Sequence, residues 1–466
     1  MIRVGPSKQR FAASFVLALL FLTLGLTQAQ TVHTEAYRLG MALQESIQKG
    51  DASLFAKTFD RDALLDRVIQ PIKMSEALQE NLRTNLQSKV SADDIAEAIR
   101  KNGRNFTFVG VRRFDYEYQL LFRVVGSHNE LVYFAYPMGK SPSGSITLVD
   151  VFCFAPPGFT SDNIRRNCLI AVANADKSAV DDWTEKEKDF ITSQQDWNEF
   201  TSQCQAGRHA VAEQTYAKLP ATLRNDPHIL YQRARVAMRE DEPTFLASIA
   251  PWQKARPRDP ALQLVLADYY LQRNRAAETI AAYERLNTQL DGDPHLDIRI
   301  AKLQATLGHT KEARTNLWQA INRDPPDPVA YAELLTWNLV ERNFEQVAHV
   351  LALQEKLFHA DLKPAVRSDD RFRDFRESAP GKKWLEAGPV VIDSEGLPVA
   401  TRSASEALKL QAILFGTATP SALINGKTLF VQDKIGGYQV IKIEPQTVTL
   451  RSAKGDTRML ALGAGP

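Results

Sequence analysis

Four Asp-Pro pairs at almost equal spacing constrain this chain more than any other feature. They stand at positions 226–227, 259–260, 293–294 and 327–328, so consecutive pairs lie 33, 34 and 34 residues apart. A fixed period of this length indicates a repeat architecture, in which each unit packs only against its neighbours. Because proline cannot continue a helix, each pair is predicted to end the second helix of a two-helix unit. The sequence therefore predicts stacked helix pairs over residues 191–362, about five in number.

The segment 295–325 shows the repeat most clearly. Gly308 marks the turn between its helices, Ala301 and Ala313 occupy the small packing positions, and Leu317 supplies the large one. The second unit departs from the pattern, because Pro251 falls inside its second helix and is predicted to break or kink it. In period and packing residues the region resembles the tetratricopeptide repeat (TPR) family. The resemblance implies an all-α, right-handed solenoid whose concave surface receives a partner.

Polar residues on the inner face of the first helices are the candidate protein-binding site. By the repeat register they are Asp268, Gln272, His295, Lys302, Thr306 and Thr336. The alternative is that these side chains only keep the concave surface soluble. The sequence indicates no preference for a particular peptide or charge.

Residues 30–190 are predicted to form an α+β domain ahead of the repeats. Residues 31–100 are helical in character, with Gly103 as the C-terminal signal, and four segments rich in β-branched and aromatic residues follow, at 105–114, 116–125, 130–139 and 145–154. Helices followed by an antiparallel meander are typical of this class. The element order and the stretch at 48–60 resemble nuclear-transport-factor-2-like (NTF2-like) domains.

The NTF2-like resemblance carries an alternative function. Helices in such domains pack on a curved sheet, sometimes around a pocket, which implies small-molecule binding or lyase-type activity here. The side chains that would line the pocket are Phe106, Phe108, Tyr116, Tyr118, Tyr133 and Tyr136. The other interpretation is that these aromatic residues simply pack a core.

The C-terminal region is predicted to hold a capping helix and linker at 363–407 and a small all-β barrel at 408–466. Asn425-Gly426 and Gly436-Gly437 separate short apolar runs, which favours tight hairpins and about five strands. Gly426-Lys427-Thr428 is not a phosphate-binding loop, because Ser421 stands where that loop requires glycine.

The strings at 410–413, 420–426 and 433–440 are similar to the periplasmic homology-region domain of type II secretion component C and secretion protein B. In those families the module docks other envelope proteins and catalyses nothing. This chain differs from them because a repeat block precedes the module and a firm membrane anchor is missing.

The N-terminus has the pattern of an export signal. Arg3, Lys8 and Arg10 precede an uncharged, mostly apolar stretch of 16 residues at 11–26, and small residues follow up to Ala29. The stretch is shorter than the ~20 residues of a membrane-spanning helix. We therefore expect residues 1–29 to be a signal peptide and the protein to be periplasmic or secreted, with an uncleaved inner-membrane anchor as the alternative.

Charge argues against nucleic acid as a partner. Removal of the three positive residues of the signal changes the formal charge from +2 to −1, which gives the mature chain no global field for nucleic acid or anionic lipid. The short basic runs Arg112-Arg113 and Lys382-Lys383 are interpreted as solvated loop charge. The expected partners are instead other envelope proteins or peptides.

No pattern in the sequence predicts catalysis, a cofactor or a metal. The eight histidines are scattered, and the cysteine spacings of 15 and 36 fit no zinc pattern. Cys153 and Cys168 are candidates for a disulfide in an oxidising compartment, with buried free thiols as the alternative. The leading hypothesis is a non-enzymatic exported scaffold, with assembly or support of a secretion or pilus system as its most concrete version. A structural envelope protein without a defined client is a third interpretation.

Overall fold

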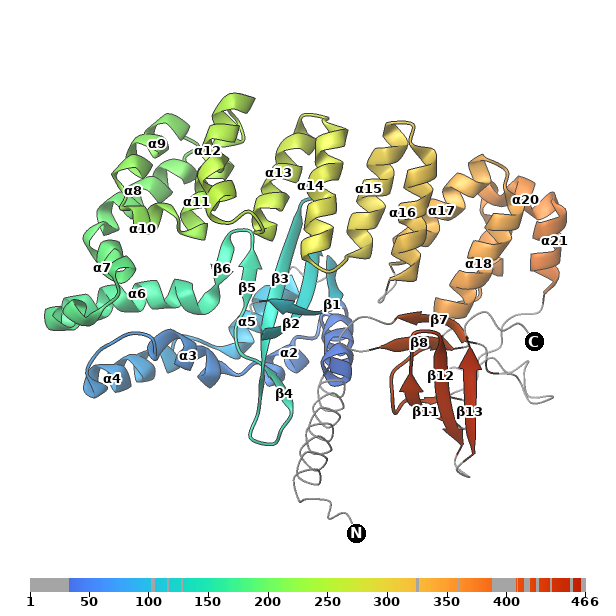
Figure 1. The fold of residues 1–466 in the computed structure, drawn as a ribbon, viewed down its shortest axis with the longest axis horizontal. Coiled ribbons are helices and arrows are strands. Elements are labelled where there is room, and N and C mark those ends of the chain that lie inside the picture. The colour runs from blue at the N-terminus through green and yellow to red at the C-terminus, as the bar shows by residue number, and fades with distance from the viewer. Residues whose placement is uncertain are drawn as a thin grey trace, which may run out of the picture. The chain divides into compact units, whose positions relative to one another are not determined.

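The chain consists of many helices and of antiparallel sheets in two separate regions (Figure 1). The computed structural model describes residues 33–101, 105–114, 117–126, 129–323, 327–358, 360–387, 408, 410–414, 420–424, 427–435, 438–452 and 456–461. One compact unit spans residues 37–327, and the other joins residues 328–466 to the first 36. The predicted signal peptide and residues 388–407 of the predicted linker lie outside the described residues. Among the described helices, none has both the length and the apolar character to cross a bilayer.

An antiparallel sheet lies within the first unit. In sheet order its strands are β1 Phe106–Phe114, β2 Glu117–Val125, β3 Leu131–Lys140, β5 Phe152–Phe154 and β6 Pro157–Phe159, and β4 Ile146–Leu148 also pairs with β3. The predicted fourth strand is therefore two strands, which pair with different parts of β3. The interruption falls at Asp150, whose buried carboxylate accepts hydrogen bonds from the Ser161 amide and hydroxyl at 3.2 and 2.6 Å. This contact holds the strand break against the start of the following helix, α6 Thr160–Ala175.

One face of the sheet packs against helical residues 37–48 and α2. The described helices around the sheet are α2 Ser53–Thr58, α3 Arg61–Ile69, α4 Glu76–Gln87, α5 Ala92–Lys101 and α6 Thr160–Ala175. Phe55 of α2 meets Tyr136 edge to face at 5.3 Å between ring centroids, and Tyr37 meets Phe108 at 5.4 Å. Phe106 stacks within the sheet on Phe122 at 4.3 Å. These aromatic side chains form a closed core.

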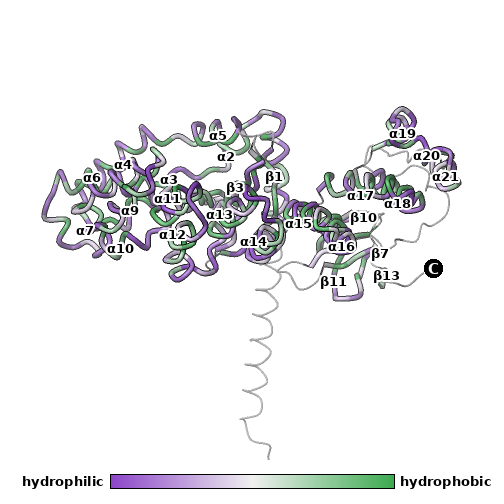
Figure 2. The backbone as a smooth tube through the Cα atoms, turned by 90° about the horizontal axis from the view of Figure 1, so that it is seen from above, coloured by the Kyte–Doolittle hydropathy of each residue, from purple (hydrophilic) through white to green (hydrophobic). Residues whose placement is uncertain are grey.

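Helix pairs follow, as the period predicts. In the first unit they are α8 Gln194–Gln205 with α9 His209–Lys218, α11 Pro227–Ala237 with α12 Glu242–Ala255, α13 Pro260–Gln272 with α14 Ala276–Gln289, and α15 Pro294–Thr306 with α16 Thr310–Asn322. Three short helices lie before or between them, η2 Lys177–Asp182, α7 Glu185–Thr192 and α10 Ala221–Arg224. Hydrophobic and hydrophilic residues alternate along these elements in Figure 2, as expected for amphipathic helices.

The Asp-Pro pairs begin helices, and the prediction that they end helices is wrong. Asp226, Asp259 and Asp293 are the N-caps of α11, α13 and α15, and each carboxylate accepts a hydrogen bond from the backbone amide two residues later at 2.9–3.0 Å. Proline then occupies the first helical position, where its missing N–H has no intrahelical partner to lose. The predicted break at Pro251 is also absent, because α12 continues through that residue.

A second periodic feature is the turn between the two helices of a pair. Gly207, Asn274, Gly308 and Arg342 have φ of +70°, +55°, +79° and +56°, so each adopts the left-handed conformation that ends a helix. Their spacings of 67, 34 and 34 residues are two periods and then one each. The same turn conformation thus recurs although the residue type changes, except between α11 and α12, where no described residue has a positive φ.

The second face of the sheet packs against the first helices of the pairs. Sheet residues Val109, Leu121 and Tyr133 belong to the same buried cluster as Leu230 of α11 and Leu264 of α13. The sheet therefore lies between the N-terminal helical residues and the repeat helices. The compact unit crosses the boundary predicted at residue 190, because the two predicted domains share this core.

Polar side chains also join the sheet to the repeat helices. Arg112 of β1 donates to the backbone oxygens of Leu290 and Gly292 at 2.6 and 2.8 Å. This contact corrects the interpretation of Arg112 as solvated loop charge. Arg123 of β2, with 4% of its side chain exposed, forms an ion pair with the fully buried Asp293.

The second unit begins with the pair α17 Pro328–Val340 and α18 Phe344–Phe358. The predicted capping helix is a series of short helices, α19 Lys363–Ser368, η3 Asp370–Phe372, α20 Arg373–Glu377 and α21 Ala379–Glu386. Phe375 lies 6.2 Å from Phe344 and from Trp384, measured between ring centroids. The aromatic contacts hold the short helices to α18.

The C-terminal strands form two antiparallel sheets. One contains β7 Leu410–Leu414, β8 Ser421–Ile424 and β9 Lys427–Leu429, and the other contains β10 Lys434–Ile435, β11 Tyr438–Ile443, β12 Thr447–Ser452 and β13 Thr457–Ala461. Ile424 pairs with Lys427, as a hairpin at 425–426 requires, although the two turn residues lie outside the described part. No pairing among the described strands joins the sheets into the predicted barrel. Both sheets instead contribute to one buried cluster, which includes Ile424 and Leu450.

Candidate binding pocket

The six predicted partner-binding residues differ in how far they are exposed. Gln272, Lys302 and Thr306 are exposed near the ends of α13 and α15, and Thr336 is exposed on α17 of the second unit. Asp268 is half-buried, 3.5 Å from the Arg235 guanidinium.

His295 belongs to a buried polar network at the sheet. Its Nδ1 lies 3.7 Å from an Asp327 carboxylate oxygen, and its Nε2 accepts from the Arg299 guanidinium at 3.1 Å. Burial and the neighbouring Arg123 guanidinium outweigh the contact with Asp327 and lower the pKa of His295. The imidazole therefore favours its neutral form. Its contacts give His295 a structural role at the junction of α15 and the sheet.

The acid in this network is held ionised. Asp293 accepts from the Arg123 guanidinium and from the Tyr133 hydroxyl, the latter at 2.6 Å. Burial raises the pKa of Asp293 most strongly, but the Arg123 charge, His295 and the hydrogen bonds from Tyr133 and Arg123 together outweigh burial and lower the pKa. Asp293 caps α15 and also binds Arg123 of β2. These two contacts together fix the position of the sheet on α15.

The aromatic residues proposed for an NTF2-like pocket are core residues in most cases. Phe106, Phe108, Tyr133 and Tyr136 are all at most 1% exposed. Tyr118 is half-buried beside the Arg113 guanidinium, and Tyr116 lies outside the described residues.

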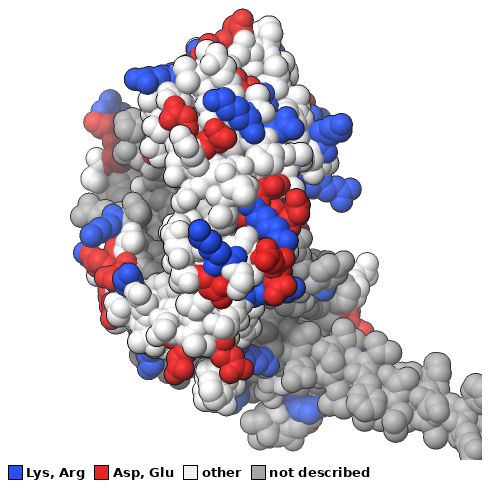
Figure 3. Space-filling model, turned by 90° about the vertical axis from the view of Figure 1, so that its left-hand side faces the viewer, with Lys and Arg blue, Asp and Glu red and all other residues white. Residues whose placement is uncertain are grey.

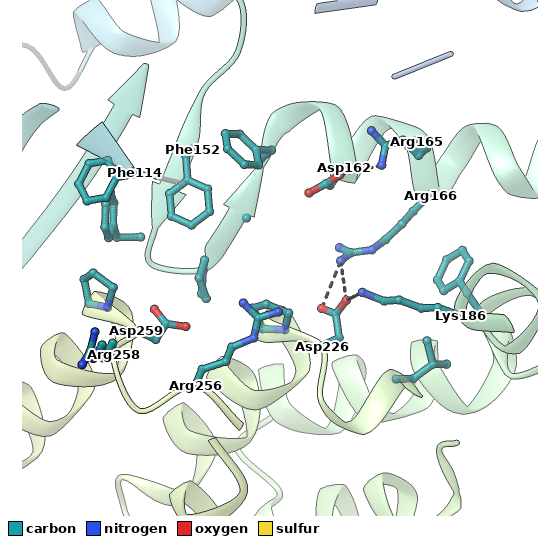
Figure 4. Close-up of a pocket in the computed structure, with 18 of the residues that line it drawn as sticks. Phe114, Phe152, Asp162, Arg165, Arg166, Lys186, Asp226, Arg256, Arg258 and Asp259 are labelled. Atoms are coloured by element: carbon teal, nitrogen blue, oxygen red, sulfur yellow. Dashed lines mark hydrogen bonds and ion pairs between the residues drawn. The ribbon is translucent and has the colours of Figure 1, made fainter. Parts of the chain in front are cut away.

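A pocket of about 820 Å³ opens at a different place, between the sheet and the repeat helices (Figure 4). Its walls are the β5–β6 hairpin, α6, the start of α7 and the loops that begin α11 and α13. The volume is in the range of sites that take a drug-sized ligand. Six lining residues are cationic and four are acidic, which leaves a surplus of two positive charges: Arg113, Arg165, Arg166, Lys186, Arg256 and Arg258 against Asp162, Glu187, Asp226 and Asp259.

Aromatic rings form two walls of this pocket. Phe152 of β5 meets Phe159 of β6 edge to face at 4.9 Å, and both rings are half-buried. On the other side, Phe190 of α7 meets Trp197 of α8 at 5.4 Å. The pocket therefore offers flat apolar surface at two separate places.

Asp226 lies between these walls, and two cations neutralise it. The Arg166 guanidinium donates to both carboxylate oxygens at 3.1 and 3.2 Å, and the Lys186 ammonium lies 2.8 Å away. Figure 4 shows the two side chains converging on Asp226 from α6 and α7. Burial raises the pKa of this acid, but Arg166 and Lys186 outweigh burial, so that the pKa is below its ordinary value.

The remaining acids of the pocket also have structural partners. Asp162 pairs with Arg165 at 3.0 Å, and Glu187 completes a capping box with Thr184 at the start of α7. Asp259 accepts from the Ala261 amide and the Trp252 indole N–H, both at 3.0 Å. Each described lining carboxylate therefore has a hydrogen-bond or ion-pair partner within the protein.

Arg256 and Arg258 differ from the paired cations Arg165, Arg166 and Lys186 of the same pocket. Arg256 and Arg258 are exposed, and no hydrogen bond or ion pair joins either guanidinium to another described residue. Pro257 lies between them, and a second proline follows at 260, so that the backbone of this loop is restricted. The loop presents two guanidinium groups to the pocket.

The lining consists of carboxylates, cations, aromatic rings and small polar or apolar residues. Among the described lining residues there is no histidine or cysteine. Within the described part of the chain, no cluster of three potential metal ligands occurs either. All three cysteines are free thiols, so the considered Cys153–Cys168 disulfide is not formed, and burial raises the pKa of Cys168 to about 11.

Sequence reasoning did not find this pocket. Its residues come from many separate elements between β1 and α14, and no local motif joins them. The one available signal was the Arg-Pro-Arg-Asp-Pro string at 256–260, in which two cations flank a proline directly before a repeat boundary.

Comparison with known proteins adds no assignment. No protein-family model matches the chain, and no curated protein matches it.

Proposed function

We propose that the protein is a non-enzymatic scaffold of the bacterial cell envelope that holds other proteins, with a role in secretion or pilus assembly as its most specific form. The observation that carries the proposal is the pocket of about 820 Å³. It combines aromatic walls, surplus positive charge and carboxylates that already have partners. Such a lining is suited to hold an extended segment of another protein and offers no free base or nucleophile for catalysis.

The covered first helices change where a partner is expected to bind. In the TPR resemblance, a peptide lies along the inner face of these helices. Here the sheet packs against α11 and α13 in a shared core. The pocket at the edge of that contact, together with the exposed ends of α13 and α15, is the surface that supports the proposal.

The C-terminal sheets support a second docking site. β13 is an edge strand of its described sheet, and Met459 on this strand is 67% exposed. Edge strands present unpaired backbone groups that accept an added strand from another chain. In the proposed scaffold, this module docks one envelope protein and the pocket holds another.

Site-specific photo-crosslinking in cells tests the scaffold function. We would place the crosslinking amino acid at Phe159 and Arg258 in the pocket, at Lys302 and Thr306 on the predicted repeat face, and at the exposed control Lys218. The expected result is a protein adduct from the pocket positions and none from Lys218. If neither pair of test positions gave a protein adduct, the scaffold proposal would fail.

Export is part of the same proposal and has a separate test. The mature protein is expected to begin at Gln30 and to fractionate with periplasmic or secreted proteins. N-terminal sequencing of the purified protein checks the first point. A chain that retained Met1 and stayed with the inner membrane would support the uncleaved anchor.

A further inference from the structure

The pocket has more positive charge than its own acids neutralise, and the surplus is concentrated at two places. Arg166 and Lys186 share the single carboxylate of Asp226. Arg256 reaches toward the same part of the pocket from the loop before α13, and Arg258 lies beside Asp259 (Figure 4). A ligand with only one negative group would leave one of these places unmatched.

Aromatic surface lies next to each cationic place. Phe152 and Phe159 form the wall on the β5–β6 side. On the other side, the Arg166 guanidinium stacks over the Trp197 ring at 5.1 Å. Cationic groups and flat apolar surface therefore both occur at two places in the lining. An extended ligand in which acidic and aromatic groups alternate can contact both kinds of surface.

The guanidinium groups of Arg256 and Arg258 are available to bind carboxylates. Each offers a planar fork of N–H donors, which fits a carboxylate with two parallel hydrogen bonds. Neither has to break an existing hydrogen bond or ion pair with a described residue in order to bind. The proline-restricted loop lowers the conformational entropy that binding would otherwise cost.

We infer that the pocket binds an acidic segment of a partner protein, in which aspartate or glutamate side chains alternate with aromatic ones. This inference rests on the proposed scaffold function and names the chemistry of its partner. Nucleic acid fits less well, since four acids line the pocket. Lys, Arg, Asp and Glu are also interspersed on the face in Figure 3, so that this face has no extended positive field.

Fluorescence anisotropy with short synthetic peptides tests the inference on the full mature chain. The probe is a fluorescein-labelled peptide that alternates aspartate and phenylalanine, with both ends blocked. Its matched control has asparagine in place of every aspartate. We expect the acidic peptide to bind about tenfold more tightly or better, and to weaken as NaCl rises from about 50 to about 300 mM because salt screens exposed charges.

Charge reversal locates the binding. The double variant Arg256→Glu/Arg258→Glu is expected to lose about tenfold or more in affinity for the acidic peptide, because two attractive groups become repulsive. The milder variant Arg256→Gln/Arg258→Gln is expected to fall between it and the unmodified protein. Arg285→Glu/Lys311→Glu makes the same change of charge at exposed residues that do not line the pocket, and is expected to leave the affinity unchanged.

Three results would overturn the inference. They are equal binding of the aspartate and asparagine peptides, unchanged affinity after charge reversal in the pocket, and equally tight binding of a neutral peptide whose only anion is its C-terminal carboxylate. Circular dichroism on each variant shows whether the fold is retained.

The scaffold function and the acidic specificity fail separately. Crosslinks from Phe159 and Arg258 without a peptide preference would leave the scaffold and remove the acidic partner. A clear preference for the acidic peptide, with no cellular protein adduct, would support the binding chemistry and remove the scaffold.

Discussion

The first and second helices of the pairs share one sequence period but have different surroundings. In α13, seven consecutive residues, 261–267, are buried, because the sheet covers one side of the helix and other helices cover the rest. In α16, the buried residues are Ala313, Leu317, Ala320 and Ile321, which are three or four positions apart except for the last two. That is the pattern of a helix with one covered face. The comparison teaches that the sheet determines which surface of the repeats remains open to a partner.

The largest expected effect comes from breaking the ion pair between the sheet and α15. Arg123→Ala leaves Asp293 buried without its cation, and such a change costs about 3–5 kcal/mol of unfolding free energy. Urea denaturation of the purified variant measures the loss. The matched control is Lys49→Ala, which removes a cation from a pair whose side chains are 70% and 68% exposed, and which is expected to leave the urea midpoint unchanged.

A small effect of Arg123→Ala would contradict the comparison. It would mean that the sheet and the first helices separate readily in solution. The inner face predicted from the repeat register would then be accessible after all.

The next largest effect is expected from the apolar part of the same contact. Leu121→Ala removes a fully buried side chain between β2 and the repeat helices, and such substitutions cost about 2–5 kcal/mol. Hydrogen–deuterium exchange gives the sharper measurement, because it reports where the stability is lost. Exchange in α13, which packs on the sheet, is expected to rise more than exchange in α16.

Equal changes in α13 and α16 would show that the unit unfolds only as a whole. Unchanged exchange in α13 would show that the repeats are stable without the sheet. The second result would contradict the assignment of one shared core to residues 37–327.

The repeat architecture was predictable because its signals are local. The spacing of the Asp-Pro pairs and the small residues at helix contacts depend only on neighbouring units, and the helix pairs were confirmed. The role of the pairs was harder to predict, because proline is compatible both with the end of one helix and with the first position of the next. Only Asp226, Asp259 and Asp293 as hydrogen-bonded caps distinguish the two.

The contact between sheet and repeats was not predicted, although a signal exists. The run Leu120-Leu121-Phe122 is buried at every residue, whereas a strand with one exposed face alternates. Such a run indicates that both faces are covered, but it does not identify what covers the second face. The pocket shares this difficulty, because residues such as Phe159 and Arg256 meet only once the sheet and helices are in place.

Asp226 and Asp259 are the two N-cap residues that line the pocket, and their pKa values are shifted in opposite directions. The pH dependence of stability therefore distinguishes them. Asp226 has a pKa below its ordinary value, so its ionised form stabilises the fold above about pH 4, and this contribution is lost as pH falls through the lower folded-state pKa. Asp226→Asn keeps a capping side chain and removes the charge. We expect it to lower the urea midpoint at neutral pH, by an amount that shrinks as pH falls below about 4.

Asp259 is expected to behave in the opposite way. Burial raises the pKa of Asp259, and this outweighs the lowering by its hydrogen bonds and by the Arg256 charge. Ionised Asp259 therefore destabilises the fold at pH values above its unfolded-state pKa, and this cost disappears as pH falls. Asp259→Asn is therefore expected to leave the urea midpoint at neutral pH unchanged or to raise it. If both variants had the same pH profile of stability, Arg166 and Lys186 would not lower the pKa of Asp226 as described.

The smallest expected effect concerns the turn between α15 and α16. Gly308 has φ of +79°, and a Cβ added there would meet nothing within 4 Å, so that Gly308→Ala costs only backbone strain of about 1–2 kcal/mol. Asn274 adopts the same conformation between α13 and α14. Asn274→Gly relieves backbone strain in the folded state. It also makes the unfolded chain more flexible, which lowers the free energy of unfolding by about 0.4–1 kcal/mol and offsets that relief. Urea midpoints are thus expected to fall for Gly308→Ala and to stay nearly constant for Asn274→Gly. Because α13–α14 and α15–α16 use one turn conformation, a large loss from Asn274→Gly would mean that the Asn274 side chain has a role that the turn conformation does not explain.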